Sequence, residues 1–186
     1  MCIRDRTETA IDGLQKDGAL VDGTRTNLVR ALVGVAVKAG STTSPDLSSV
    51  DAFKRSLLAA KTVSYVDPKA GGTSGTYFEG LLAKMGIADQ MKSKIVYRTT
   101  GAGVADAVAT GAAEFGVTFI AELSPNKGVK IAGPLPNEIQ LPTNYLAAVP
   151  KVSANQGPAR AFIQAMTAPG GQAVFKGAGL TPLPAH

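Results

Sequence analysis

A loop rich in glycine and hydroxyl residues, between an expected strand and an expected helix, holds the residues best suited to chemistry. The apolar run over 62–66 predicts the strand, and apolar residues at helical spacing from Tyr77 to Met85 predict the helix. The first N–H groups of a helix have no partner inside it, and with the positive end of the helix dipole they attract an anion. The residues expected to bind such an anion are Gly72, Thr73, Ser74 and Gly75.

The same loop also fits an ordinary connection in which Ser or Thr caps the helix. It has neither the lysine of a P-loop nor the G-x-G-x-x-G spacing of a dinucleotide site. A second glycine-rich turn, with Thr100 and Gly101, opens another expected helix. Ligands of α/β sheets sit beyond the carboxyl ends of the strands, so we expect both turns to open on one side and to favour the anion site.

Composition excludes several other kinds of site. The 186 residues are 45% hydrophobic and 18% charged, and the formal net charge of +5 is scattered without the aromatic-flanked basic runs of a nucleic-acid-binding protein. The single cysteine, Cys2, and the single histidine, His186, leave no disulfide framework, no triad and no Cys- or His-based metal centre. We therefore expect no metal and no cofactor. The longest apolar run, over 31–37, is too short to span a membrane.

The beginning of the chain is unusual. Residues 1–6, MCIRDR, lack the apolar region of a signal peptide and look like a non-native scar. A helix expected at 7–16, with no strand before it, suggests that the natural beginning is missing. We expect a signal peptide to have been lost with it.

Strand and helix patterns alternate along the rest of the chain. Alternation of this kind predicts an α/β fold with a largely parallel sheet. The helix expected at 158–167 should bury Ala161, Phe162, Ala165 and Met166. Strands are expected at 32–38, 62–66, 94–98, 114–120, 129–133 and 144–149, and further helices near 50–60, 77–85, 87–92, 104–110 and 171–176, with a polar connection at 22–27 and a turn at 122–127.

Four segments in order, VGVAVKAG, SYVDPKAGGTSGTYFEGLLAKMGI, GVADAVATGAAEFGVTFIAEL and GVKIAGPLPNEIQ, carry a family resemblance. The chain resembles the molybdate-type periplasmic solute-binding proteins of ABC transporters. The resemblance implies an α/β, two-lobed periplasmic-binding-protein-like fold of type II, with the first lobe incomplete and the ligand between the lobes. Residues 38–127 would form lobe 2, and 7–37 with 128–186 the remnant of lobe 1.

The resemblance also implies a site and partners. Its backbone donors match Ser74 and a position at or near Gly101, and a tyrosine that donates to the oxyanion in the molybdate binders falls at Phe119. The expected ligand is a small anion, either an oxyanion such as molybdate or tungstate or an organic carboxylate. The expected partner is an ABC transporter permease, the expected location is the periplasm, and the full-length protein is expected to be a monomer.

Two alternatives stay open. The segments SSVDAF, 121–123 and the G-P-L-P region at 133–136 are similar to a subgroup that includes aconitate isomerase. That enzyme moves a proton between carbons of a tricarboxylate and needs an acid or base beside a bound polyanion. Candidates for the acid or base are Glu122, Tyr77, Tyr97 and Asp67, each of which also fits a structural role. Arg98 or Lys69 would pair with the carboxylates of the substrate, and the first choices for the alternative catalytic set are Glu122, Tyr77 and Arg98. The effector domain of a LysR-type regulator shares the two-lobed architecture, but nothing in residues 1–30 resembles a helix-turn-helix.

Overall fold

The computed structural model describes residues 4–185 and divides into two compact units. The central unit is Leu32–Leu141, and the terminal unit combines the residues up to Ala31 with those from Pro142 onward. These junctions differ by several residues from the expected lobe limits at 37/38 and 127/128, and the assignment of lobes stays a prediction. Of the segment expected to be a scar, residues 1–3 lie outside the described residues, and the backbone from Arg4 onward is part of a strand.

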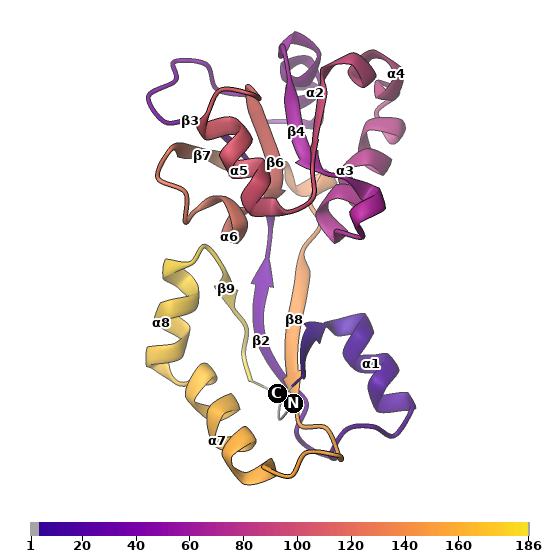
Figure 1. The fold of residues 1–186 in the computed structure, drawn as a ribbon, viewed down its shortest axis with the longest axis vertical. Helices are drawn as coiled ribbons and strands as arrows, with labels where there is room; N and C mark the ends of the chain where they lie inside the picture. Colours follow the sequence, from indigo (N-terminus) through magenta and orange to yellow (C-terminus); the bar gives the residue numbers. More distant parts are fainter. Residues whose placement is uncertain (1–3, 186) are drawn as a thin grey trace. The chain divides into compact units, whose positions relative to one another are not determined.

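The central unit is built on one five-stranded sheet in the order β5-β4-β6-β3-β7. The expectation of a largely parallel sheet is wrong for half of it: β4 pairs in parallel with β5 and β6, whereas β3 pairs antiparallel with β6 and β7. In Figure 1, β3 and β7 lie on the left of this unit, β6 in the middle and β4 to its right. The bounds are Val33–Lys38 for β3, Val63–Val66 for β4, Ile95–Arg98 for β5, Phe115–Phe119 for β6 and Val129–Pro134 for β7.

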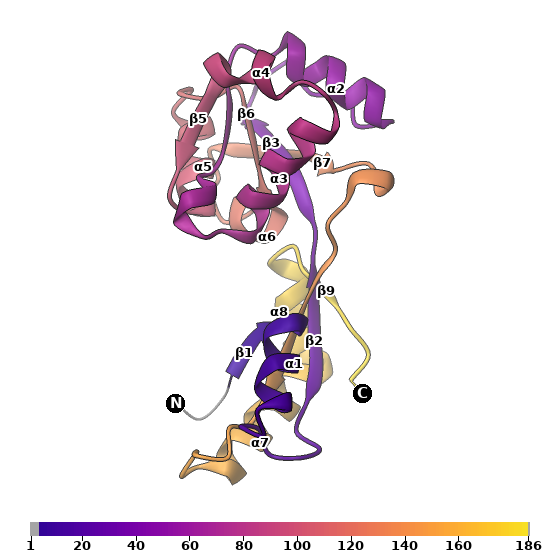
Figure 2. The ribbon, with the colours of Figure 1, turned by 90° about the vertical axis from the view of Figure 1, so that its right-hand side faces the viewer.

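Helices cover both faces of this sheet. Tyr65 of β4 stacks edge-on against Phe78 of α3, with ring centroids 5.1 Å apart, and the next residue, Val66, packs with Val104 and Ala105 of α5. Successive strand residues point to opposite faces, so α3 and α5 cover opposite faces. In Figure 2, α3 lies beside α4 and α2, and α5 lies next to β5. The bounds are Val50–Ala59 for α2, Thr73–Lys84 for α3, Ala88–Met91 for α4, Gly101–Ala109 for α5 and Ile120–Leu123 for α6, with 3-10 turns η1 (Pro68–Ala70), η2 (Lys92–Lys94) and η3 (Asn137–Ile139).

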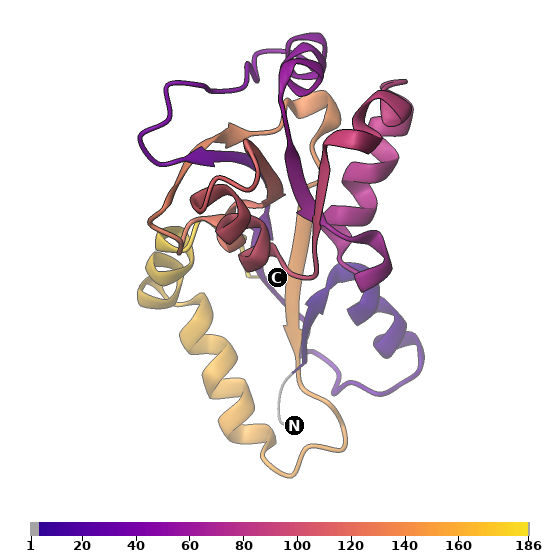
Figure 3. The ribbon, with the colours of Figure 1, turned by 45° about the horizontal axis from the view of Figure 1, so that its top comes forward.

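The terminal unit has an antiparallel sheet in the order β1-β8-β2-β9. Leu146 and Ala148 of β8 pack towards α1, and the alternate residues Ala147 and Val149 pack towards α7. Figures 1 and 3 show α1 on one side of β8, and α7 with α8 on the other. The bounds are Arg4–Thr7 for β1, Glu8–Lys16 for α1, Thr26–Ala31 for β2, Thr143–Ala148 for β8, Gln156–Thr167 for α7, Pro169–Gly177 for α8 and Thr181–Pro182 for β9.

Three local expectations are corrected. The first helix is not without a preceding strand, because β1 comes directly before α1 and pairs with β8. The expected polar connection at 22–27 ends inside β2, where Thr26 and Asn27 pair with β8. The expected turn at 122–127 begins inside the short helix α6. Each error concerns polar residues that long-range strand pairing or a single helical turn can still accommodate.

The buried face of α7 also differs from the expectation. Phe162 is 57% exposed, and the inward residues are Ala159 and Ile163, at 2% and 5%. Ala161 and Ala165 are exposed, whereas Met166 is half-buried against the core. The helical period fits both choices, because Phe162 and Ile163 are neighbours in the chain and either can start an i, i+3, i+4 pattern.

This correction yields a first testable prediction. Ile163→Ala should lower the free energy of unfolding by about 2–5 kcal/mol, as expected when a buried aliphatic side chain is removed. Phe162→Ala should change it by no more than about 0.5 kcal/mol, because most of the ring is already in water. Denaturant melts of the two variants measure both values. A larger loss for Phe162→Ala than for Ile163→Ala would mean that the face of α7 with Phe162, and not the face with Ile163, packs in the core of the terminal unit.

Candidate functional site

Three helices of the central unit begin at one edge of its sheet. α3, α5 and α6 follow β4, β5 and β6, which are parallel neighbours and therefore end at the same edge. The N–H of Asp67 donates to the carbonyl of Arg98 at 2.7 Å and ties the loop after β4 to the end of β5. The two glycine-rich turns therefore lie at one edge of the sheet, although the bodies of α3 and α5 cover opposite faces, and their opening onto a shared anion site remains a prediction.

The start of α3 presents backbone donors. Gly72 is the N-cap residue, with extended dihedrals of φ −75° and ψ 127°, and no side chain among residues 4–185 caps this end. The first intrahelical bond runs from the N–H of Thr76 to the carbonyl of Gly72, at 3.1 Å. The amides of residues 73–75 come before this bond and are the donors that a helix offers to an anion.

Ser74 joins this start of α3 to β6. Ser74 is 3% exposed, and its Oγ lies 3.0 Å from Oγ1 of Thr118, which is fully buried. Thr118 Oγ1 in turn donates to Oε2 of Glu122. The sequence reasoning missed Thr118, although one signal was present: it is the hydroxyl residue inside the otherwise apolar run FGVTFI.

The start of α5 has a similar construction. Thr100 is the N-cap residue, and its Oγ1 accepts a hydrogen bond from the N–H of Gly103 at 3.1 Å. The N–H of Val104 donates to the carbonyl of Thr100, so the amides of residues 101–103 precede the first intrahelical bond, and those of 101 and 102 are not capped by Thr100. A β-carbon at Gly101 would overlap the carboxylate of Glu122 and lie 2.7 Å from its Cβ. The side chain of Glu122 therefore lies directly on the first residue of α5.

Phe119 is not brought to this hydroxyl chain. It is 7% exposed and pairs with Val33 as the last residue of β6. Since it follows Thr118 in the strand, its side chain leaves the opposite face of the sheet. Its role as a ligand-binding residue remains a prediction, without a position beside Ser74 to support it.

The remaining candidates for acid–base chemistry have structural partners. The hydroxyl of Tyr77 donates to the carbonyl of Ile139 at 2.9 Å, and burial raises the pKa of this phenol. Arg98 Nη1 donates to the carbonyl of Tyr97 at 2.8 Å. Of the three alternative catalytic residues, Glu122 is the one that the structure joins to Ser74.

Two further candidates serve the loop and the core. Asp67 Oδ1 accepts from the N–H of Lys69 at 2.9 Å, which is an Asx turn capping η1. The hydroxyl of Tyr97 donates to Oε1 of Glu79 at 3.1 Å and lies 3.4 Å from the hydroxyl of Tyr65. Burial, followed by the hydrogen bond with Tyr97, raises the pKa of Tyr65. These contacts give Asp67 and Tyr97 structural roles that require no bound ligand.

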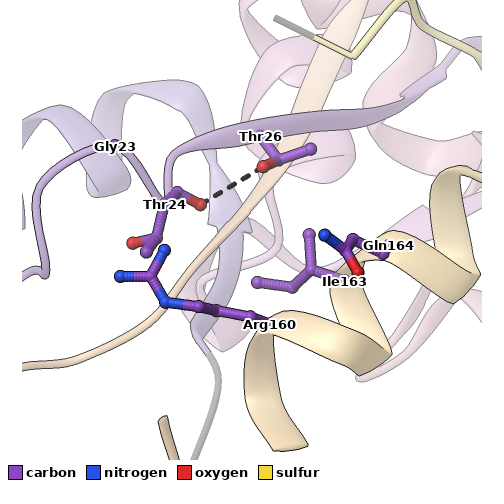
Figure 4. Close-up of a pocket in the computed structure, with 6 residues that line it drawn as sticks. All are labelled: Gly23, Thr24, Thr26, Arg160, Ile163 and Gln164. Carbon is purple, nitrogen blue, oxygen red and sulfur yellow. Dashed lines mark hydrogen bonds between the residues drawn. The ribbon is translucent and has the colours of Figure 1, made fainter. Parts of the chain in front are cut away.

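A small hollow lies in the terminal unit (Figure 4), and none of the residues predicted to bind lines it. Its volume is about 120 Å³. Thr24 Oγ1 donates to the carbonyl of Val21 at 2.6 Å and accepts from the N–H of Val149 at 3.1 Å, and Thr26 Oγ1 donates to the carbonyl of Thr24 at 3.2 Å. The hydroxyls that line the hollow are therefore bonded to the backbone of the same unit. The lining residues are Gly23, Thr24, Thr26, Arg160, Ile163 and Gln164.

Residues 4–185 contain neither a cluster of metal ligands nor a membrane-spanning helix. No group of three or more His, Cys, Asp or Glu side chains is placed to hold a metal ion there. None of the helices in that range combines the length and apolar character needed to cross a membrane.

Comparison with known proteins identifies the family of the chain. The family described as "Bacterial extracellular solute-binding protein" matches residues 6–181. The chain belongs to this family. Its fold is shared by the substrate-binding domain of a putative molybdenum ABC transporter from Clostridium difficile, with a TM-score of 0.78 and 20% identity over 98% of this chain and 77% of that one. The periplasmic molybdate-binding protein of Azotobacter vinelandii shares the fold with a TM-score of 0.70 and 22% identity, over 98% of this chain and 78% of that one.

The resemblance to molybdate-type solute-binding proteins and the α/β, type II periplasmic-binding-protein-like fold are thereby confirmed. A curated relative, an aconitate isomerase from a Pseudomonas species, is 29% identical over 178 residues. That alignment covers 96% of this chain and 66% of the relative, so the chain spans slightly less than two thirds of the length of the enzyme it matches.

Proposed function

We propose that this solute-binding protein takes up a small oxyanion or organic carboxylate at the starts of α3 and α5. One observation carries the proposal: a single carboxylate, that of Glu122, reaches both starts, through Thr118 to Ser74 and by direct contact to Gly101. A negatively charged group of the chain therefore lies near both helix starts, which supports a site for an anion there. Helix starts favour such a group through their dipoles and their unpaired N–H donors.

The relatives support the wider setting of the proposal. Structures of the same fold include proteins named for molybdate and for tungstate, and one is described as part of a molybdenum ABC transporter. By analogy, the protein would work as a monomer in the periplasm and deliver its ligand to an ABC transporter permease.

Isothermal titration calorimetry with a panel of anions tests this function. The panel pairs molybdate, tungstate, sulfate and phosphate with succinate, malate, citrate and trans-aconitate, and uses a neutral sugar as a control. We expect at least one oxyanion or carboxylate to bind with micromolar or tighter affinity and the sugar to show no heat. A folded protein that binds none of these anions would contradict the proposal.

A second candidate function is isomerisation of a tricarboxylate. It is favoured by the aconitate isomerase relative and by the position of Glu122, which could accept a proton from a carbon of a carboxylate bound at the helix starts. The reaction would remove a proton from one carbon and return one to another, with no net change in atoms or charge. Incubation with cis- and trans-aconitate, followed by chromatography, separates this function from binding alone. Loss of turnover in Glu122→Gln with binding retained would support the enzyme.

A further inference from the structure

Glu122 lies beside the helix starts at which the proposed function places an anion. Its carboxylate accepts from Thr118 and contacts the backbone of Gly101 at the first residue of α5. The residue as a whole is exposed, and α6, which carries it, has only four residues. The structure therefore holds a carboxylate of the chain itself next to the proposed anion site, on a short element at the surface.

The direction of the hydroxyl chain follows from counting protons. Thr118 has one hydroxyl proton and gives it to Glu122, so it can only accept from Ser74. The single hydroxyl proton of Ser74 then points at Thr118 and is not offered to a ligand. An ionised Glu122 thus sets the polarity of both hydroxyls against an incoming anion.

We propose that Glu122 is a specificity-determining residue that disfavours fully ionised oxyanions and favours anions that also carry a hydrogen-bond donor. The inference rests on the proposed function and refines it. A ligand oxygen without a proton would meet the Glu122 carboxylate as a like charge in a partly buried place, which is costly. A ligand hydroxyl would donate to the same carboxylate, which has lone pairs left after accepting from Thr118.

Replacing Glu122 with glutamine should remove this selection with little change of shape. The glutamine amide keeps an oxygen that can accept from Thr118. It can also turn its NH2 group towards Thr118, which reverses the hydroxyl chain and lets Ser74 donate to the ligand. Either orientation removes the negative charge from the start of α5.

The test compares sulfate with phosphate, two tetrahedral anions of similar size. Near neutral pH sulfate carries no proton, whereas the dominant form of phosphate carries one. Calorimetry should show the unchanged protein binding phosphate more tightly than sulfate, and Glu122→Gln binding sulfate at least about tenfold more tightly than the unchanged protein does. Succinate and malate, which differ by one hydroxyl, repeat the comparison for carboxylates.

The matched control is Asp89→Asn, which removes one negative charge from the same unit. Asp89 lies on α4, beyond the C-terminal end of α3, and its exposed side chain pairs with Lys92 at 2.7 Å. This variant should leave both affinities unchanged, because an exposed charge on a different element is screened by salt.

The outcomes distinguish a failure of the role of Glu122 from a failure of the proposed function. Anion binding by the unchanged protein, with no gain for sulfate in Glu122→Gln, overturns the role of Glu122 and leaves the proposed function standing. A similar gain in Asp89→Asn also overturns it, since net charge would then explain the effect. No binding of any tested anion by either folded protein contradicts the proposed function and the inference together.

Discussion

Gly75→Ala is expected to destabilise the central unit by about 3 kcal/mol, the upper end of the usual cost of overpacking, although alanine is the better helix former. Gly75 is buried in the first turn of α3, where a β-carbon would overlap the carbonyl oxygen of Val66. The same atom would lie 2.8 Å from the carbonyl carbon of Val66 and 3.1 Å from its Cβ. The carbonyl group and the Cβ of Val66 are fixed by the backbone of β4. The overlap can therefore be removed only if α3 moves away from the sheet.

Gly80→Ala is the matched control, because it makes the same change in the same helix. Gly80 is exposed, and a β-carbon there would meet no atom within 4 Å. It should stabilise the protein by about 0.5–1 kcal/mol through helix propensity alone. Urea melts of both variants give the two values. Equal effects at both positions would show that α3 does not rest on Val66 as described.

The contacts of Gly75 give the glycine-rich loop before α3 a structural role. Gly72 and Gly75 of the first loop were expected to bind an anion. The structure instead has Gly72 and Gly75 against Val66, and Gly71 with a positive φ of 79° at the end of η1. Their first task is therefore to bring the start of α3 close to the end of β4. A glycine in a sequence does not show whether its empty side faces a ligand or a neighbouring strand.

The elements themselves followed from local patterns. Apolar runs bounded by turn residues located β3 to β8, and helical spacing located α2, α3, α5 and α7 within a few residues. Local patterns contain no information on which strands become neighbours, and so the antiparallel placement of β3 between β6 and β7 was missed. The short strand β1 was missed because its residues are polar and its pairing with β8 joins distant parts of the chain.

The site was predictable from the sequence only in its backbone part. A glycine and hydroxyl turn after a strand identified Ser74 and Gly101 as residues at helix starts, and both lie there. Thr118 was missed because a single threonine in a strand gives no sign of its partner 44 residues earlier. Glu122 was considered as a catalytic group, but its contact with Gly101 depends on how β6 and α5 pack and has no local signal.

Ser74→Pro should weaken anion binding by about ten- to a hundredfold, which is the loss expected for one hydrogen bond to a charged group. Proline removes the amide hydrogen of Ser74, one of the three donors that precede the first intrahelical bond of α3. It also removes the hydroxyl that contacts Thr118. Calorimetry with the tightest anion of the panel measures the loss, and a thermal melt reports whether α3 still forms.

Two further variants isolate the contribution of the amide. Ser74→Ala keeps the N–H and loses the hydroxyl, so the affinity difference between it and Ser74→Pro reflects the amide together with any strain from the ring. Thr73→Pro removes the neighbouring N–H at the first helical position, where Gly72 already has the extended backbone that a residue before proline requires. It should fold and still bind more weakly. Unchanged affinity in Thr73→Pro and Ser74→Pro, with intact melts, would mean that the start of α3 does not hold the ligand.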